Sequence, residues 1–457
     1  MKIPLSPKPT AQLLSEITTA KDMDRLMAII SRGEIAPGGK YRHWDILRHL
    51  SPPDGLSHEE WWLSIKMARQ SAMKPLPMCN AQGKPFIYAL PDQLQRMTHE
   101  IDRDASGQIK ISEQVTNPNT RDRYIINSLI EEAITSSQLE GASTTRRLAK
   151  EMIRTGRKPV DRSEQMIFNN FKAMQYVRKI VGKKLGPDHV LFLHRLVTED
   201  TLVDPADAGR LRRTDDIRIT NERGSVLHAP PPASMLSERL NSMCAFANHR
   251  QSDPFVHPVI RAILLHFWLA YDHPFVDGNG RTARALFYWS MLSQGYWLSE
   301  YISISRILRA APPKYSRSFL FTETDENDTT YFIIYQLEVI RRAIKDLHSY
   351  LEAKITEIKT TESLIRRSGD LNHRQLALIT HALKDPDTRY TIQSHKKSNN
   401  IAYQTARTDL LDLSEKGLLE KTKIGKTYSF FAPMDLAERL KHAPANDAAI
   451  VQPNRRA

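Results

Sequence analysis

Two strongly apolar segments joined by a polar loop constrain the fold of this chain more than any other feature. The segment VIRAILLHFWLA covers residues 259–270, and ARALFYWSML covers residues 283–292. Helices that are apolar almost all round are buried in the centre of a domain, so we expect both at the core of a mainly α-helical fold. A polar, glycine-containing loop between two buried helices needs hydrogen-bond partners for its backbone. A functional site is the economical explanation for such a loop.

The start of the second helix has the residues of an anion site. Gly278, Asn279 and Gly280 precede the helix, where exposed backbone N–H groups and the positive end of the helix dipole attract a phosphate. Arg281 and Arg284 are three positions apart, so on a helix they share a face and reach the same polyphosphate. Taken alone, each residue is explained more simply as a turn residue or as part of a solvated face. Together they favour a phosphate site.

Two further residues of the loop indicate chemistry. Asp277 supplies a hard oxygen ligand, which suits a Mg²⁺ ion that keeps most of its waters and bridges phosphates. His273 is the nearby side chain whose ordinary pKa suits a general base at neutral pH. The alternatives are a turn or cap role for Asp277 and a hydrogen-bonded core role for His273. With the arginines, the two residues indicate Mg²⁺-dependent transfer of a phosphorus-centred group.

The complete loop, HPFVDGNGRTAR, resembles the HPFx[D/E]GN[G/K]RxxR signature of Fic-domain proteins in every specified position. The similarity extends through LHRLV (193–197), GRLRRT (209–214) and the hairpin-like segment 217–230, and it covers roughly residues 110–345. The resemblance implies a Fic-type helical bundle with a β-hairpin flap. It also implies transfer of AMP from ATP to a hydroxyl group of a target protein.

The resemblance assigns roles to the residues of the loop. His273 would deprotonate a Ser, Thr or Tyr hydroxyl of the target, and Asp277 would hold Mg²⁺ between the α- and β-phosphates of ATP. Phe275 would anchor the loop in the core. The nucleotide phosphates would be bound by the loop and the residues after it, Gly278, Asn279, Gly280, Arg281 and Arg284.

Three flap residues and one tyrosine complete the implied nucleotide and target site. Residues Val226, Leu227 and His228 would align a target segment by β-strand addition, in which backbone hydrogen bonds give affinity without strict sequence choice. Relatives commonly have a Tyr-Tyr pair near the adenine, whereas here Tyr315 is followed by Ser316. Asp325 stands at a position where relatives often have Asn.

A second motif, upstream of the first, predicts regulation. The run SSQLEG ends a helical pattern with Glu140, a carboxylate at the negative end of the helix dipole, followed by the helix-stopping Gly141. Ser136, Glu140 and Gly141 match the inhibitory [S/T]xxxE[G/N] motif of Fic proteins. The resemblance implies that Glu140 pairs with Arg284 and blocks placement of the γ-phosphate. The same carboxylate could instead orient a water that removes AMP from a modified target.

The chain is long enough for several domains. We expect a mainly α-helical protein with a small α+β domain, because two helical patterns followed by two strand-like runs look like a winged helix-turn-helix near the C-terminus. The expected regions are a helical N-terminal region (1–105), a Fic catalytic domain with its inhibitory helix (106–345), a helical linker (346–370), the winged-helix-like domain (371–435) and a disordered tail (436–457).

The net charge of +13 favours acidic or phosphate-bearing partners. Residues 141–184 contain twelve Lys and Arg against three acidic residues, and residues 371–433 contain ten against six. A solvated face explains either segment. A DNA or protein partner for residues 371–433 is the alternative, and it would make the chain a DNA-binding transcriptional regulator. The remaining functional alternatives are a bifunctional or AMP-removing enzyme and another phosphoryl-type transferase.

The other features of the sequence are consistent with a cytoplasmic enzyme. Cys79 and Cys244 lack the spacing of a zinc site or a disulfide framework. No signal peptide and no membrane-spanning apolar run is recognisable. We therefore expect ATP and Mg²⁺ as ligands and a target protein as partner, with self-modification and pairing with a second copy of the chain as further expectations.

Overall fold

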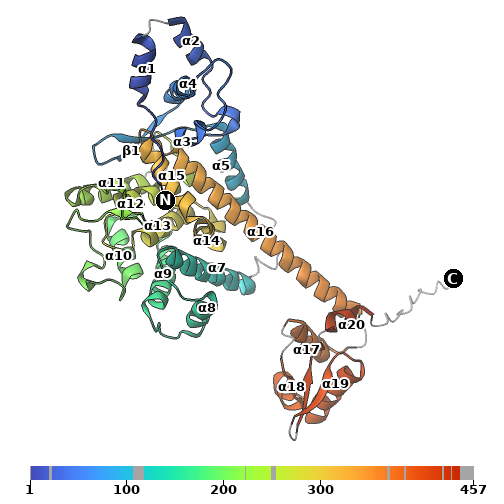
Figure 1. Cartoon of the computed structure of the whole chain (residues 1–457). Helices are drawn as coiled ribbons and strands as arrows, with labels where there is room; N and C mark the ends of the chain where they lie inside the picture. The colour runs from blue at the N-terminus through green and yellow to red at the C-terminus, as the bar shows by residue number, and fades with distance from the viewer. Residues whose placement is uncertain are drawn as a thin grey trace, which may run out of the picture. The chain divides into compact units, whose positions relative to one another are not determined.

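The structure is a computed structural model that describes residues 2–19, 23–105, 118–221, 223–248, 254–367, 371–384, 388–424, 427–433 and 435–442. The chain forms two compact units, Met1–Leu347 and His348–Ala457 (Figure 1). Within the described ranges the fold is mainly α-helical, with three two-stranded antiparallel hairpins. None of the described helices is both long enough and apolar enough to cross a bilayer.

The two apolar segments form the central helices of the first unit. Helix α12 (Pro258–Asp272) begins with a proline in the favourable first position, and α13 (Asn279–Ser293) packs against it (Figure 1). Every residue from 259 to 269 is buried, as the sequence predicts. Because these helices have no solvent-facing side, the loop between them is held from all directions by the elements around it.

Helices α7 and α9 and the elements that follow them surround this central pair. The flap hairpin joins β3 to β4 with Ile219 opposite His228 and Thr220 opposite Val226. The bounds of these elements are α7 (Pro118–Leu139), α8 (Arg146–Thr155), α9 (Arg162–Lys179), α10 (Pro187–Thr198), β3 (Ile219–Thr220), β4 (Val226–His228), α11 (Leu236–Asn248), α14 (Ile304–Ala310) and α15 (Pro312–Thr324).

The N-terminal region is helical except for one hairpin that the sequence analysis did not predict. Pro75 and Pro77 obscure the alternation of β1, because proline in a strand is confined to edges and bulges. The capping box of Ser57 and Glu60 begins α4 as expected. The elements are α1 (Thr10–Thr19), α2 (Met23–Ser31), α3 (Trp44–Leu47), α4 (His58–Gln70), β1 (Lys74–Cys79), β2 (Pro85–Tyr88) and α5 (Asp92–Ala105).

A buried charged cluster fastens the N-terminal region to the segment between α15 and α16 (Thr330–Arg367). Lys66 Nζ lies 2.8 Å from Asp325 Oδ1, and the other carboxylate oxygen of Asp325 accepts a hydrogen bond from Tyr331 at 2.7 Å. Arg69 donates to the same tyrosine oxygen at 2.7 Å. Asp325 is therefore held by the N-terminal region. The expected region boundary at residue 105 adjoins residues outside the described ranges and stays a prediction.

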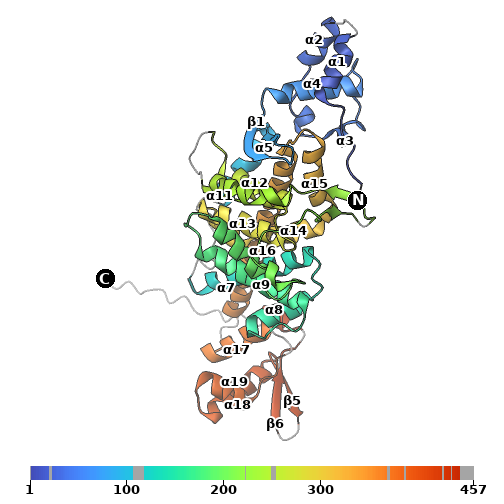
Figure 2. The same ribbon diagram turned by 90° about the vertical axis from the view of Figure 1, so that its left-hand side faces the viewer.

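The second unit contains the last part of α16 and the region predicted to be winged-helix-like. Three helices are followed by a hairpin, and Tyr390, between the first two helices, forms an antiparallel bridge to Phe430 in the hairpin (Figure 2). The elements are α17 (His373–Lys384), α18 (Ile392–Asn399), α19 (Tyr403–Glu415), β5 (Glu420–Ile424), β6 (Thr427–Phe431) and α20 (Leu436–His442). Residues 436–442 of the expected disordered tail form α20, with Leu436 and Leu440 in the core of the unit, and residues 443–457 lie outside the described ranges.

Candidate active site

The loop between α12 and α13 has an unusual backbone that its own side chains stabilise. His273 ends α12 with φ 44°, in the left-handed region that non-glycine residues seldom adopt, and Gly278 precedes α13 with φ 83°. The Asn279 side chain accepts a hydrogen bond from Phe275 N at 2.9 Å and donates one to Phe275 O at 2.8 Å. The amide of Asn279 is thus used to shape the loop.

His194 of α10 supports the loop through hydrogen bonds and a ring stack. Its Nδ1 accepts a hydrogen bond from Gly209 N at 3.0 Å, so the proton is on Nε2, which donates to Asp277 O at 2.9 Å. The imidazole stacks on Phe275 at a centroid distance of 3.7 Å. Burial lowers the pKa of His194 to about 4, which keeps the ring neutral and preserves this donor and acceptor pattern.

Arg212 connects the same loop to both ends of the flap. Its Nε donates to His273 O at 3.0 Å, while Nη1 donates to Thr214 O at 2.8 Å and Nη2 donates to Pro231 O. The Arg212 backbone N–H donates to Pro274 O at 2.9 Å. A single buried guanidinium therefore satisfies carbonyl groups from three segments of the chain.

The imidazole of His273 is held as a proton acceptor. Its Nδ1 faces the carbonyl of Ala270 at 3.4 Å, and since a carbonyl accepts hydrogen bonds, the proton belongs on Nδ1. Nε2 is then the acceptor nitrogen. Burial lowers the pKa of His273 to about 4, so the ring is neutral at pH 7 and can take a proton from a substrate hydroxyl.

Two buried arginines near the start of α13 carry hydrogen-bond donors that lack acceptors. Arg281 donates from Nη1 to Val197 O at 2.6 Å, but its Nε and Nη2 make no hydrogen bond, and Nη2 lies 3.5 Å from Asp277 Oδ1. Arg284 Nη1 likewise has no hydrogen-bond partner. Buried donors are costly when unsatisfied, so an unbonded set at a helix start indicates a site for an anion.

The carboxylate of Asp277 is partly exposed beside these arginines. Its Oδ1 accepts from Gly278 N at 2.5 Å, and its Oδ2 lies 3.3 Å from Arg162 Nη2. Among the described residues, no group of three or more His, Cys, Asp or Glu side chains could hold a metal by itself. A single carboxylate fits a Mg²⁺ ion that takes its other ligands from water and substrate phosphates.

Glu140 reaches the anion site from the end of α7. Its Oε1 accepts a hydrogen bond from Arg284 Nη2 at 2.9 Å, and Ser136 Oγ accepts one from Arg284 Nε at 2.8 Å. A Cβ atom added to Gly280 would lie 2.0 Å from Glu140 Oε1, so glycine at this position gives the carboxylate its space. Gly141 follows with φ 96°, a conformation suited to glycine after a helix.

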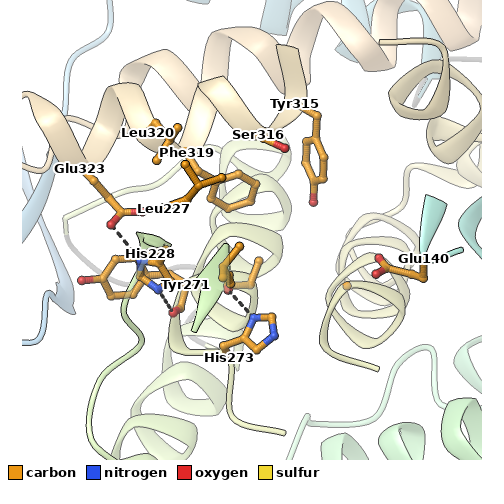
Figure 3. A pocket seen from close by; sticks show the side chains of 13 residues that line it. Glu140, Leu227, His228, Tyr271, His273, Tyr315, Ser316, Phe319, Leu320 and Glu323 are labelled. Atoms are coloured by element: carbon orange, nitrogen blue, oxygen red, sulfur yellow. Dashed lines mark hydrogen bonds and ion pairs between the residues drawn. The ribbon is translucent and has the colours of Figure 1, made fainter. Parts of the chain in front are cut away.

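A pocket of about 240 Å³ opens between His273, Glu140 and the flap. Figure 3 shows Glu140 and the His228–Glu323 pair on opposite sides of this pocket. His228 Nδ1 lies 2.8 Å from Glu323 Oε2, and His228 Nε2 lies 2.7 Å from Tyr271 O. Burial acts to lower the pKa of His228, but the hydrogen bond to Glu323, the negative charges of Glu323 and Asp272 and the hydrogen bond to Tyr271 O together outweigh it, so the pKa is raised. A protonated His228 satisfies both acceptors.

The structure brings together most of the residues that the sequence analysis named. The pocket is lined by six of them: Glu140, His273, Gly280, Tyr315, and Leu227 and His228 of the flap. Ser316 also lines the pocket. Tyr315 is partly buried, and its hydroxyl lies 2.8 Å from His266 Nε2. Val226 is largely exposed and does not line the pocket.

The motifs of the sequence do not identify the residues that support the loop and the flap. His194 and Arg212 lie in segments that the resemblance covers, yet no motif spacing reveals their contacts, because His194 and Asp277 are 83 positions apart. Glu323 was missed for the same reason, since its partner His228 is 95 positions away.

Comparison with known proteins places this site in a family. Residues 184–291, from the start of α10 almost to the end of α13, match the model of the Fic/DOC family. The chain is 28% identical over 259 residues to a protein named Protein adenylyltransferase Fic from Drosophila mojavensis, which covers 56% of this chain and 48% of that protein. A protein of the same name from Nematostella vectensis is 27% identical over 169 residues, 35% of this chain and 37% of that relative.

A solved structure shares the fold. The crystal structure of a Fic family protein from Desulfovibrio desulfuricans G20 matches with a TM-score of 0.52 and 18% identity, covering 76% of this chain and 97% of that one. The chain spans about half or less of the length of the curated relatives described above. The region that contains the central helices and the loop between them therefore matches the Fic/DOC family model, and the chain is similar to Fic proteins over this region.

Proposed function

We propose that the chain is a protein adenylyltransferase that moves AMP from ATP to a hydroxyl of a protein. The observation that carries the proposal is the set of unbonded, buried N–H groups of Arg281 and Arg284, at the start of the helix whose Gly280 lines the same pocket as His273. A relative that is 28% identical over 259 residues is named for this activity. Donors for a polyphosphate next to a neutral base suit attack of a hydroxyl on phosphorus.

In the proposed reaction the target hydroxyl loses its proton to Nε2 of His273. The hydroxyl oxygen forms a bond to the α-phosphorus of ATP, and the bond from that phosphorus to the bridging oxygen breaks, releasing pyrophosphate. Arg281 and Arg284 bind the β- and γ-phosphates, together with backbone N–H groups at the start of α13. The Asn279 side chain supports this step indirectly, because it holds the loop through Phe275.

Mg²⁺ fits this site as a ligand that comes with the nucleotide. Asp277 would hold it, and the ion would neutralise charge on the phosphates. Arg162 is exposed and pairs with the same carboxylate, so it can give way to a cation. The flap would align the target, with the exposed Val226 in the strand that receives it.

Glu140 is proposed to inhibit the transfer. Its carboxylate uses Arg284, which the γ-phosphate needs, and it lies within the pocket. The same carboxylate could orient a water for removal of AMP from a modified target. Loss of AMP from a modified protein with the wild type, but not with Glu140→Gly, would support that second activity.

The test uses ATP labelled at either the α- or the γ-phosphate. We expect the Glu140→Gly variant to transfer label to itself from the α position, with pyrophosphate as the other product. The matched control is the same variant with His273→Ala, which keeps the nucleotide site but lacks the base. Label that is transferred from the γ position alone would replace AMP transfer by kinase-like chemistry.

A further inference from the structure

The second unit contains two helices arranged as a helix-turn-helix. Helix α18 ends at Asn399, and α19 begins at Tyr403 after a turn in which Asn400 adopts φ 48°. Ile392 of α18 and Leu410 of α19 share one apolar core with Phe430 of the hairpin. Two helices joined by a turn of three or four residues and packed on one core form the unit that inserts its second helix into the DNA major groove.

The first half of α19 presents polar side chains on one face. Tyr403, Gln404, Arg407 and Thr408 are exposed and fall within an arc of about 140° at 100° per residue. Arg and Gln make bidentate contacts to the edges of guanine and adenine, and Thr contacts several bases. A recognition helix reads bases mainly with its N-terminal residues, which is the half of α19 that carries this face.

Exposed lysines lie on α18 and on the β5–β6 hairpin, whereas the acidic Asp409 of α19 is paired within the unit. Lys397 at the end of α18 is exposed and Lys396 is partly exposed, and in the hairpin Lys421 and Lys423 are exposed. Among the described residues, no ion pair involves any of these four lysines or Arg407. By contrast, Asp409 in the second half of α19 pairs with Arg374 at 2.8 Å and lies 3.1 Å from His395.

The hydrogen bonds of Asp409 fix the geometry of the two helices. Its carboxylate accepts from Asn372 at 2.9 Å, from Arg374 at 2.8 and 3.0 Å, and from His395 Nε2 at 3.1 Å. His395 lies in α18, so this buried carboxylate joins α17, α18 and α19. The polar face of α19 is thus carried on a rigid support, as sequence reading requires.

We propose that this unit binds duplex DNA, with α19 in the major groove and the lysines of α18 and of the β5–β6 hairpin on the phosphates. Lys421 Nζ lies 4.7 Å from the ring centroid of Tyr428, and Tyr428 is exposed. The pair is suited to contact the phosphate backbone at the edge of a DNA groove. The modest net charge of the unit is no obstacle, because the acidic residues of α19 lie in its second half and the binding face is basic.

The test is fluorescence anisotropy of the full-length protein with a labelled random-sequence duplex of 30 base pairs, over a salt series. With four phosphate contacts, we expect the association constant to fall about a hundredfold between 50 and 200 mM salt. Lys396→Glu combined with Lys397→Glu should weaken binding at least about tenfold. Arg407→Ala should also weaken it, and circular dichroism verifies that each variant is folded.

The matched control reverses two charges in the other basic segment, with Arg147→Glu and Lys158→Glu on exposed positions of the first unit. We expect this control to bind the duplex as the wild type does. An equal loss in the control would assign binding to overall charge and overturn the proposal. Undetectable binding at 50 mM salt, binding that ignores salt, or a preference for single-stranded RNA over the duplex would overturn it as well.

Discussion

At residue 140 a carboxylate occupies a place that a phosphate is proposed to need. Glu140 gains one charged hydrogen bond from Arg284, and Gly280 leaves it the necessary space. We expect Glu140→Gly to raise self-modification about tenfold, because removal of a competing anion of this kind is typically equivalent to 1–3 kcal/mol. Transfer of α-labelled AMP to the protein measures the effect.

The control for this prediction is Glu199→Gly. Glu199 also follows a helix and makes a surface ion pair, with Lys172 at 2.9 Å, but it does not line the pocket. We expect this variant to match the wild type. Equal labelling of the wild type and Glu140→Gly would show that Glu140 is an ordinary helix end.

The proton affinity of His273 gives a second prediction at this scale. Because burial lowers its pKa to about 4, the group should be a competent base well below pH 6. In the Glu140→Gly background, kcat/KM should fall on the acid side with a midpoint near or below pH 4. Removal of the Glu140 charge should also lower the pKa of His273, since that charge raises it in the wild type. A midpoint near 6.5 would mean that the imidazole is solvated.

At the scale of elements, the flap is fastened to α15 by a charged hydrogen bond. The pKa of His228 is raised in the folded state, so the bond to Glu323 adds stability below the ordinary value of 6.5, and that stability is lost as the pH rises through the folded pKa. At pH 6 we expect Glu323→Gln to speed hydrogen exchange in residues 217–230 roughly fivefold. The ratio to the wild type should shrink towards one at high pH.

Glu238→Gln provides the comparison for the flap. Glu238 is exposed on α11, and no ion pair involves it among the described residues. Its exchange pattern should follow the wild type at every pH. A Glu323→Gln effect that is the same at pH 6 and at high pH would contradict protonation of His228.

Sequence reasoning predicted the elements that have a strong local pattern. The apolar runs gave α12 and α13, and the loop composition gave His273 and the arginines as a group. The β1–β2 hairpin was not predicted, because Pro75 and Pro77 obscure the alternation of side chains that is typical of a strand. The contacts of His194 and Arg212 were not predicted for another reason. They depend on which distant carbonyl groups the packing brings near, and the local sequence does not predict those neighbours.

At the scale of the whole molecule, buried charged groups join the N-terminal region to the rest of the first unit. Lys66 is almost fully buried with Asp325, so its removal leaves a carboxylate without its cation. We expect Lys66→Met to lower the stability of the first unit by roughly 3 kcal/mol. Thermal unfolding of the full-length protein, followed by circular dichroism, measures this.

Two further variants make this prediction specific. Lys74→Met changes an exposed lysine of the same region and should leave the unfolding temperature unchanged. Lys66→Met combined with Asp325→Asn removes both charges and should recover part of the loss, because the uncompensated charge causes much of it. No recovery in the double variant would assign the loss to packing.

The contacts of Arg212 have a consequence for how targets of different shapes could be received in the proposed reaction. One guanidinium holds Thr214 O at the start of the flap and Pro231 O at its end, and it also holds His273 O. The chain between these points carries the β3–β4 hairpin, and one side chain closes its base. The strands could therefore receive different target segments while the base of the hairpin, and His273 fastened to it, keep their place.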